Sequence, residues 1–265
     1  MMGVPLVLED KAALITGGSR GIGAETVRLF AMAGARVAFS YRQARERAEA
    51  LAAECGGGDR CFPIRQDLAT PADGRALVEG AVRALGRLDI LVVNHGIWYP
   101  HDAPIASMPE EQWRETLGVN LDSVFGLVQA AVAQMGRQQR IADESGSTGH
   151  IVLISSTAGQ RGEAFHADYA VTKGALISLT KSLSSELAPQ GIRVNCVAPG
   201  WVTTEMSAGT LAHSELGPKV AAGIPVGRPG HPREIAGPVL FLCTPLAGFI
   251  TGEILNVNGG AVLVG

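Results

Sequence analysis

The sequence predicts one α/β domain built on a parallel sheet of seven strands, doubly wound so that helices cover both faces. Short apolar runs alternate with helical patterns along the chain, as expected for strands joined by crossover helices. The length of 265 residues is ordinary for a single α/β domain, and neither a repeat nor a linker divides residues 1–265. With 46% apolar and 18% charged residues, the chain has the composition of a globular protein.

Each expected strand is a short apolar run, which suits a strand that is buried on both faces of a parallel sheet. Between these runs the apolar residues recur at helical spacing, as at Val27, Leu29, Phe30 and Ala33 after the first strand. The expected strands are residues 12–16, 36–41, 60–65, 89–94, 150–155, 193–198 and 254–257.

Two segments interrupt this alternation of strands and helices. Residues 138–149 are polar and predict a longer surface loop. Residues 203–233 are rich in glycine and carry only short apolar patches. Long segments of this kind within a compact domain are commonly functional or disordered, so we expect residues 203–233 to serve the functional site.

Charge and cysteine content argue against several classes of function. The net charge of −3 gives no electrostatic reason to expect binding to nucleic acid or to an anionic membrane. The apolar stretches at 4–8 and 238–250 are too short to span a bilayer, and no basic leader precedes the first. Cys55, Cys61, Cys196 and Cys243 lack metal-binding spacing. We therefore expect reduced thiols, no metal site and a cytoplasmic protein.

A cluster of glycines follows the first expected strand and precedes the first helical pattern. It reads Gly17-Gly18-Ser19-Arg20-Gly21-Ile22-Gly23. Glycines between a strand and a helix permit a tight turn and let backbone N–H groups approach a pyrophosphate at the helix N-terminus. Glycines can also do no more than turn a chain, but this context favours a dinucleotide-binding turn.

Tyr169 and Lys173 are four residues apart, so in a helix they lie on one face, one turn from each other. A lysine ammonium beside a phenol lowers the phenol's pKa from its ordinary value of about 10. Ser155 and Ser156 end the strand upstream, and of the two we expect Ser156 to face the same site, since neighbouring strand residues point to opposite sides. On spacing alone such a pair is more often a surface contact. The upstream serines and the glycine turn favour acid–base chemistry instead.

Two asparagines add to this set. Asn94 ends the fourth expected strand, and Asn120 lies in an otherwise apolar helical pattern. A buried asparagine must satisfy its amide, either through a structural bond to the backbone or as part of a proton relay.

Taken together, these residues resemble the short-chain dehydrogenase/reductase family, and among its members most closely the 3-oxoacyl-carrier-protein reductase-like proteins. The resemblance implies a Rossmann-type domain and an enzyme that interconverts a ketone and a secondary alcohol by hydride transfer. The matching residues occur in the family's order and span nearly the whole chain: Thr16, Gly17, Gly21, Gly23, Asp67, Asn94, His95, Gly96, Asn120, Ser156, Tyr169, Lys173, Pro199, Gly200 and Thr204.

The resemblance also implies roles for four catalytic residues. Ser156 would bond to the substrate oxygen and Tyr169 would exchange a proton with it. Lys173 would hold the nicotinamide ribose and lower the Tyr169 pKa by roughly two units. Asn120 would anchor a water that supplies protons to Lys173. Residues 203–233 would form a substrate lid.

The sequence favours NADP(H) over NAD(H). An acidic residue after the second strand selects NAD by bonding to the ribose 2′-hydroxyl, but Arg42 stands there and Arg20 lies in the glycine turn. Two guanidinium groups suit a 2′-phosphate; the alternative is that Arg42 only ends a solvated strand. The expected cofactor contacts are Gly17, Ser19, Arg20, Gly21, Ile22, Gly23, Tyr41, Arg42, Asp67, Leu68, Asn94, Gly96, Tyr169, Lys173, Pro199, Gly200, Val202 and Thr204.

The chain departs from the family pattern at His95, Asn258 and Gln190. Gln190 replaces an arginine that often contacts the acyl carrier, which argues against carrier-protein binding. His95 makes the wall near the adenosine ribose bulkier. The expected substrate pocket is largely apolar, with one or two polar groups, and its candidates are Trp98, Tyr99, Arg161, Phe165, His166, Trp201 and Met206. Among these, His166 could tune Tyr169, although loop histidines are more often solvated.

Two alternatives stay open at this point. One is an NAD-dependent dehydrogenase of a sugar or a cyclic alcohol, and the other is a non-catalytic dinucleotide-sensing protein. The resemblance further implies a homotetramer. In support, the helix after Tyr169 has few charges and several small residues, among them Gly174, Ser178 and Ser182.

Overall fold

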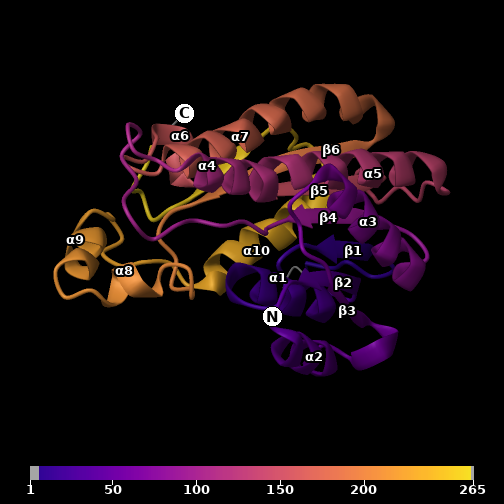
Figure 1. The fold of residues 1–265 in the computed structure, drawn as a ribbon. Coiled ribbons are helices and arrows are strands. Elements are labelled where there is room, and N and C mark those ends of the chain that lie inside the picture. The colour runs from indigo at the N-terminus through magenta and orange to yellow at the C-terminus, as the bar shows by residue number, and fades with distance from the viewer. Residues whose placement is uncertain (1–5, 264–265) are drawn as a thin grey trace.

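The computed structural model describes residues 6–263; the ends of the chain at 1–5 and 264–265, with part of the 4–8 stretch, lie outside the described residues. Its centre is a parallel seven-stranded sheet in the order β3-β2-β1-β4-β5-β6-β7 (Figure 1). The predicted fold and all seven predicted strands are confirmed, with ends that differ by at most one residue. The strands are β1 Ala12–Ile15, β2 Arg36–Tyr41, β3 Cys61–Arg65, β4 Ile90–Val93, β5 Gly149–Ile154, β6 Ile192–Pro199 and β7 Ile254–Val257.

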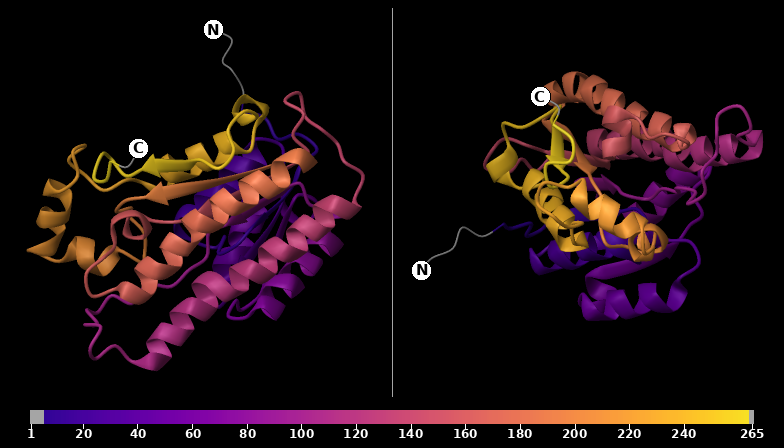
Figure 2. Two further views of the ribbon diagram at one scale, coloured as in Figure 1. Left: turned by 90° about the horizontal axis from the view of Figure 1, so that it is seen from above. Right: turned by 90° about the vertical axis from the view of Figure 1, so that its left-hand side faces the viewer.

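Helices cover both faces of the sheet because alternate strand residues point to opposite sides. Ala13 and Ile15 of β1 join one buried cluster, and Ala12 and Leu14 join the other. On the first side lie α1 Gly21–Met32, α2 Arg45–Glu54 and α10 Pro232–Leu242. On the second lie α3 Pro71–Leu85, α5 Ser123–Arg137 and α7 Ala167–Leu187 (Figures 1 and 2).

The third helix shows how local sequence sets an element's ends. Thr70 accepts a hydrogen bond from the Asp73 backbone while the Asp73 carboxylate accepts one from the Thr70 backbone, which forms a capping box. Pro71 occupies the first turn, where no N–H partner is needed. Gly86 ends the helix in the left-handed region at φ 80°.

A continuous helical stretch runs from α4 Glu110–Leu117 through a π-helical turn, Gly118–Asp122, into α5. By length and composition alone these 28 residues would be enough to cross a membrane, but half of the most apolar window is buried inside the protein. Its α5 portion packs against α3. A core helix of a globular domain has the same properties. The shorter helices are α6 Thr157–Arg161, η1 Gly57–Asp59, η3 Ala188–Gln190 and η4 Pro245–Ala247.

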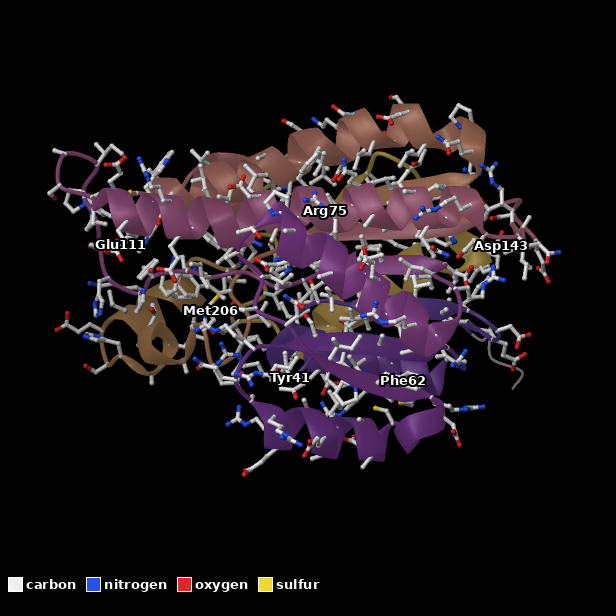
Figure 3. All side chains as sticks on the ribbon, turned by 45° about the vertical axis from the view of Figure 1, so that its right-hand side comes forward. Tyr41, Phe62, Arg75, Glu111, Asp143 and Met206 are labelled. Atoms are coloured by element: carbon white, nitrogen blue, oxygen red, sulfur yellow. The ribbon has the colours of Figure 1, made fainter. Side chains whose placement is uncertain are left out.

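Both irregular segments lie where the sequence placed them, at opposite ends of the strands. Residues 138–148 form a loop before β5 in which the Asp143 carboxylate accepts bonds from the backbone of Ser145 and Ser147. Residues 203–231 follow β6 and contain α8 Ala208–Ala212 and α9 Leu216–Ala222. Asp143 and Met206 mark these two ends in Figure 3.

Candidate active site

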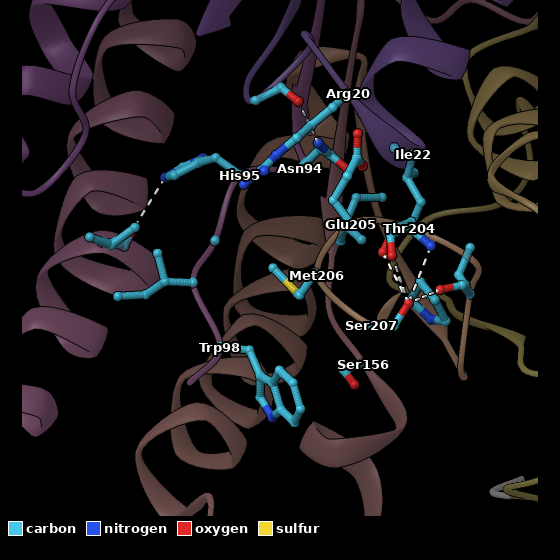
Figure 4. A pocket seen from close by; sticks show the side chains of 18 of the residues that line it. Arg20, Ile22, Asn94, His95, Trp98, Ser156, Thr204, Glu205, Met206 and Ser207 are labelled. Atoms are coloured by element: carbon cyan, nitrogen blue, oxygen red, sulfur yellow. Dashed lines mark hydrogen bonds between the residues drawn. The ribbon is translucent and has the colours of Figure 1, made fainter. Parts of the chain in front are cut away.

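A cavity of about 550 Å³ lies at the carboxyl ends of the strands. Its walls come from the segments that follow β1 to β6 and from α7. The sheet order reverses between β1 and β4, and in open α/β sheets this switch point is where ligands bind. The volume lies within the range of small-molecule and cofactor sites. Figure 4 shows part of this cavity.

The glycine turn is compact and fastened to β4. Gly17 and Gly21 have φ of 64° and 54°, which favours glycine. A Cβ on Gly23 would stand 2.2 Å from the Gly17 carbonyl oxygen, so this contact also requires glycine. The Asn94 amide donates to the carbonyls of Thr16 and Gly17 at 3.0 and 3.2 Å. No side chain caps α1 at Arg20, which leaves the N–H groups of its first turn for a phosphate.

Two guanidinium groups flank the end of the cavity next to β2. Arg20 and Arg42 are both exposed and both line it. Between them, the Ser40 hydroxyl accepts a bond of 3.0 Å from the Gly17 backbone and so holds the turn to β2. This arrangement offers two cations to an anionic group at that end.

At the other end of the cavity lie Ser156, Tyr169 and Lys173. The Ser156 hydroxyl accepts a bond of 3.0 Å from the Ala158 backbone, caps α6 and bonds to the Tyr169 phenol. Ser155 faces away and donates to the Lys173 carbonyl oxygen at 2.7 Å. The alternation at the end of β5 therefore directs one serine into the cavity and the other into the core.

Burial dominates the ionisation of the catalytic pair. It raises the pKa of Tyr169 to about 12, partly opposed by the bond to Ser156, and it lowers the pKa of Lys173 to about 8. The predicted lowering of the Tyr169 pKa is therefore wrong for the protein by itself. The Lys173 ammonium donates to the Ile154 carbonyl at 2.9 Å and lies 5.6 Å from the centre of the phenol ring. At neutral pH the phenol is protonated.

Asn120 lies in the π-helical turn and links three elements. Its Oδ1 accepts a bond of 2.8 Å from the Ile97 backbone, and its Nδ2 donates to the Ile97 carbonyl at 2.9 Å and to Thr172 at 3.3 Å. Of the two alternatives that the sequence left open for this asparagine, these contacts are the structural bond to the backbone. A Cβ on Gly96 would stand 3.2 Å from Asn120 Oδ1 and 3.4 Å from Lys173 Nζ, so both groups face the same point.

The surroundings of two histidine side chains, His95 and His166, differ from what the sequence pattern indicates. His95 lines the cavity, bonds to Thr16 at 2.7 Å and Ser123 at 2.8 Å, and has its pKa lowered by burial to about 3, so it is neutral. His166 is only 6% exposed and packs against Trp98 with ring centres 5.0 Å apart, so the expectation that it is solvated was wrong.

Of the residues predicted to contact the cofactor, all except Gly23 line this one cavity. Gly23 instead lies behind the turn, against Gly17. Among the substrate-pocket candidates, Trp98, Arg161, Trp201 and Met206 line the cavity, whereas Tyr99, Phe165 and His166 do not. Glu163 and Glu205 line it without having been predicted. Within residues 6–263, no group of three or more His, Cys, Asp or Glu side chains is placed to hold a metal ion.

Comparison with known proteins agrees with this geometry. A family model described as enoyl-(acyl carrier protein) reductase matches residues 17–262. The 3-oxoacyl-acyl-carrier-protein reductase FabG of Staphylococcus aureus is 38% identical over 251 residues, which cover 94% of this chain and 97% of that protein. The crystal structure of a Brucella melitensis short-chain dehydrogenase/reductase, described as a glucose/ribitol dehydrogenase, superposes with a TM-score of 0.86 at 35% identity and covers 97% of this chain and 98% of that one.

The chain belongs to the short-chain dehydrogenase/reductase family. It is accordingly an oxidoreductase that acts on CH–OH groups with NAD(P) as the redox partner. A further family structure, a blue fluorescent protein from a metagenomic library in complex with NADPH, has a TM-score of 0.86 at 35% identity, covering 97% of this chain and 99% of that one.

Proposed function

We propose that this short-chain dehydrogenase/reductase uses NADP(H) to interconvert a ketone and a secondary alcohol. The observation that carries the proposal is one cavity with Arg20 and Arg42 at one end and Ser156, Tyr169 and Lys173 at the other. Such a cavity suits an elongated cofactor that carries a phosphate at one end and its reactive group at the other.

The residues fit such a cofactor. A glycine turn that admits no side chain at Gly23 and an uncapped α1 N-terminus suit a pyrophosphate. The two arginines suit a 2′-phosphate, and the NADPH-bound relative points the same way. Asp67 and Leu68 would hold the adenine, and Pro199, Gly200, Val202 and Thr204 the nicotinamide side. The cofactor, when bound, supplies or accepts the hydride.

The chain's own residues would handle the proton and the orientation. Ser156 would donate to the substrate oxygen and hold it beside Tyr169. A phenol with a raised pKa is protonated at neutral pH, which is the form that donates to a carbonyl oxygen during reduction. Lys173 would bond to the nicotinamide ribose. Asn120 would stabilise the Ile97 loop next to Lys173 and complete the proton relay.

The remaining parts of the proposal concern the surroundings of the site. Residues 203–233, which begin at the cavity with Thr204 to Ser207, would act as a substrate lid within one domain. The partner would be a small carbonyl or alcohol with a substantial apolar part, since Trp98, Trp201 and Met206 line the wall. The enzyme would work in the cytoplasm as a homotetramer.

The test is a spectrophotometric assay of the purified protein with NADPH and, separately, NADH, against a panel of ketones. We expect consumption of NADPH at the nicotinamide absorbance with at least one ketone, and a higher kcat/KM with NADPH than with NADH. Faster turnover with NADH would remove the argument from the two arginines. Binding of NADPH without turnover of any ketone or alcohol would support the alternative of a dinucleotide-sensing protein.

A further inference from the structure

The wall beside the catalytic serine and tyrosine carries an acidic side chain that the proton relay does not use. Glu163 lines the same cavity as Ser156 and Tyr169 and is half-buried. Burial is the largest influence on this carboxyl and raises its pKa, and the carboxylate in turn acts electrostatically on Tyr169. Glu163 follows α6, which Ser156 caps, so it belongs to the same stretch of cavity wall as the serine and the tyrosine.

The backbone around Glu163 is held in an unusual shape. Gly162 ends α6 at φ 78°, and Phe165 has φ 65°, a left-handed conformation that non-glycine residues rarely adopt. The His166 N–H donates to the Glu163 carbonyl at 3.2 Å, which closes the turn, and the Ala103 N–H donates to the Phe165 carbonyl at 3.0 Å. Phe165 is 51% exposed, so burial of its side chain does not explain the strain. Such strain clusters at ligand sites.

Aromatic side chains surround this carboxylate. The Trp98 ring lies between His166 and Trp201, at centre-to-centre distances of 5.0 and 6.2 Å. Trp98 and Trp201 line the same cavity as Glu163. Figure 4 shows Trp98 on the same side of the cavity as Ser156. Indole faces pack well against C–H groups while the carboxylate beside them accepts a hydrogen bond.

The charges on this wall select among polar substrates. Arg161 lines the same cavity, and its positive charge lowers the pKa of Glu163, against the effect of burial. A substrate carboxylate would meet the Glu163 charge, and a substrate ammonium would meet the Arg161 charge. A neutral hydroxyl can donate to the first and accept from the second.

We propose that Glu163 is a specificity-determining residue that accepts a hydrogen bond from a hydroxyl group close to the reacting carbon of the substrate. The substrate class is then a hydroxylated cyclic ketone or the corresponding polyol, packed against Trp98 and Trp201. This inference rests on the proposed ketone–alcohol activity and narrows it.

The experiment compares two ketones that differ by one hydroxyl, cyclohexanone and 2-hydroxycyclohexanone, in the Glu163→Met variant, which keeps the length of the side chain and removes the acceptor. We expect kcat/KM for the hydroxylated ketone to fall about tenfold or more, mainly through KM, because a bond from a hydroxyl to a charged acceptor is lost. Cyclohexanone reports any effect of the variant on Tyr169 alone, so we expect the ratio of kcat/KM for the hydroxylated ketone to that for cyclohexanone to fall about tenfold. Glu163→Gln, which keeps an acceptor oxygen, should recover part of the loss.

Glu79→Met is the matched control, because Glu79 is an exposed residue of α3 outside the cavity, and it should change neither substrate. An equal loss for both ketones in Glu163→Met would mean that Glu163 only supports the turn, and no loss for either would overturn the inference. Failure of the wild-type enzyme to reduce any ketone would instead overturn the underlying proposal, so the two failures are distinct.

Discussion

Arg47 of α2 and Glu205, which follows β6, form an ion pair with Nη1 and Oε1 2.9 Å apart, although the residues are 158 positions apart in the chain. Glu205 lines the cavity (Figure 4). Gln43 and Ala44, immediately before α2, line it as well. The pair therefore joins the two sides of the cavity at the end next to α2, and it is exposed to solvent.

Glu205→Gln should accelerate the release of NADPH. Exposed ion pairs contribute about 0.2–1 kcal/mol, so we expect a rate of release up to about fivefold higher. Stopped-flow fluorescence of bound NADPH measures this rate. The control is Glu49→Gln, because Glu49 pairs with Arg45 within α2 and does not bridge the cavity. Equal acceleration in both variants would show that the effect comes from net charge and not from the bridge.

Tyr169→Phe should lower kcat by about 10² or more. The variant keeps the ring and removes only the hydroxyl that bonds to Ser156. NADPH affinity should change little, because Lys173, Arg20 and Arg42 remain. Steady-state kinetics together with a fluorescence titration of NADPH separate the two quantities. Turnover near that of the wild type would remove Tyr169 from the proposed relay.

Arg42→Asp should weaken NADPH binding by more than tenfold while NADH binds as well as before or better. The change removes one cation and adds a carboxylate near the expected 2′-phosphate. Arg75→Asp changes the net charge equally on an exposed part of α3 and should leave both affinities unaltered. Calorimetric titration with both cofactors measures the difference. Equal weakening of both cofactors would place Arg42 elsewhere than at the 2′-phosphate.

The fold could be predicted almost completely from the sequence because each strand is a short apolar run with distinct flanking residues. Most of the residues that line the cavity could also be predicted, since the strand–glycine–helix context, Arg20 after β1 and Arg42 after β2 are local features of the chain. Gly23 differs because its role depends on how closely α1 approaches the Gly17 carbonyl, a distance that no pattern reports.

Other features depend on the direction in which a side chain points, which a sequence pattern does not report. Spacing places Lys173 on the same helix face as Tyr169, but its ammonium is directed to the Ile154 carbonyl, so burial controls the Tyr169 pKa. Glu163 lies between Gly162 and Phe165, both of which have positive φ. In the sequence, an acidic residue at such a position looks like part of a solvent-exposed loop. Its place in the cavity wall follows only from the turn.

Lys173 should make the protein more stable as pH rises from about 8 to 10. Burial lowers its folded pKa to about 8, below the ordinary lysine value of 10.5, so over this range the unfolded chain binds more protons than the folded one. The full contribution is on the order of 3 kcal/mol. Urea unfolding at pH 8 and pH 10 measures it, with Lys173→Met as the comparison. An equal pH dependence in both proteins would contradict this assignment; Tyr169, whose raised pKa lowers stability only above about pH 10, does not interfere.

The last prediction concerns assembly. On α7 an exposed row of Val171, Ser178, Ser182 and Ser185 is interrupted by one charge, Lys181. Val171 is 49% exposed, and Phe125 of the neighbouring α5 is 55% exposed. A weakly polar helix face with small side chains suits a symmetric contact with a second copy.

Light scattering behind a sizing column should therefore give about four times the 27.5 kDa of one chain at micromolar concentration. Ser178→Arg places a long cation on this face and should reduce the mass to that of a smaller assembly. Ala76→Arg is the control, because Ala76 is exposed on α3, and it should leave the mass unchanged. A wild-type mass equal to one chain would rule out the tetramer, and an unchanged mass in Ser178→Arg would place the contact away from α7.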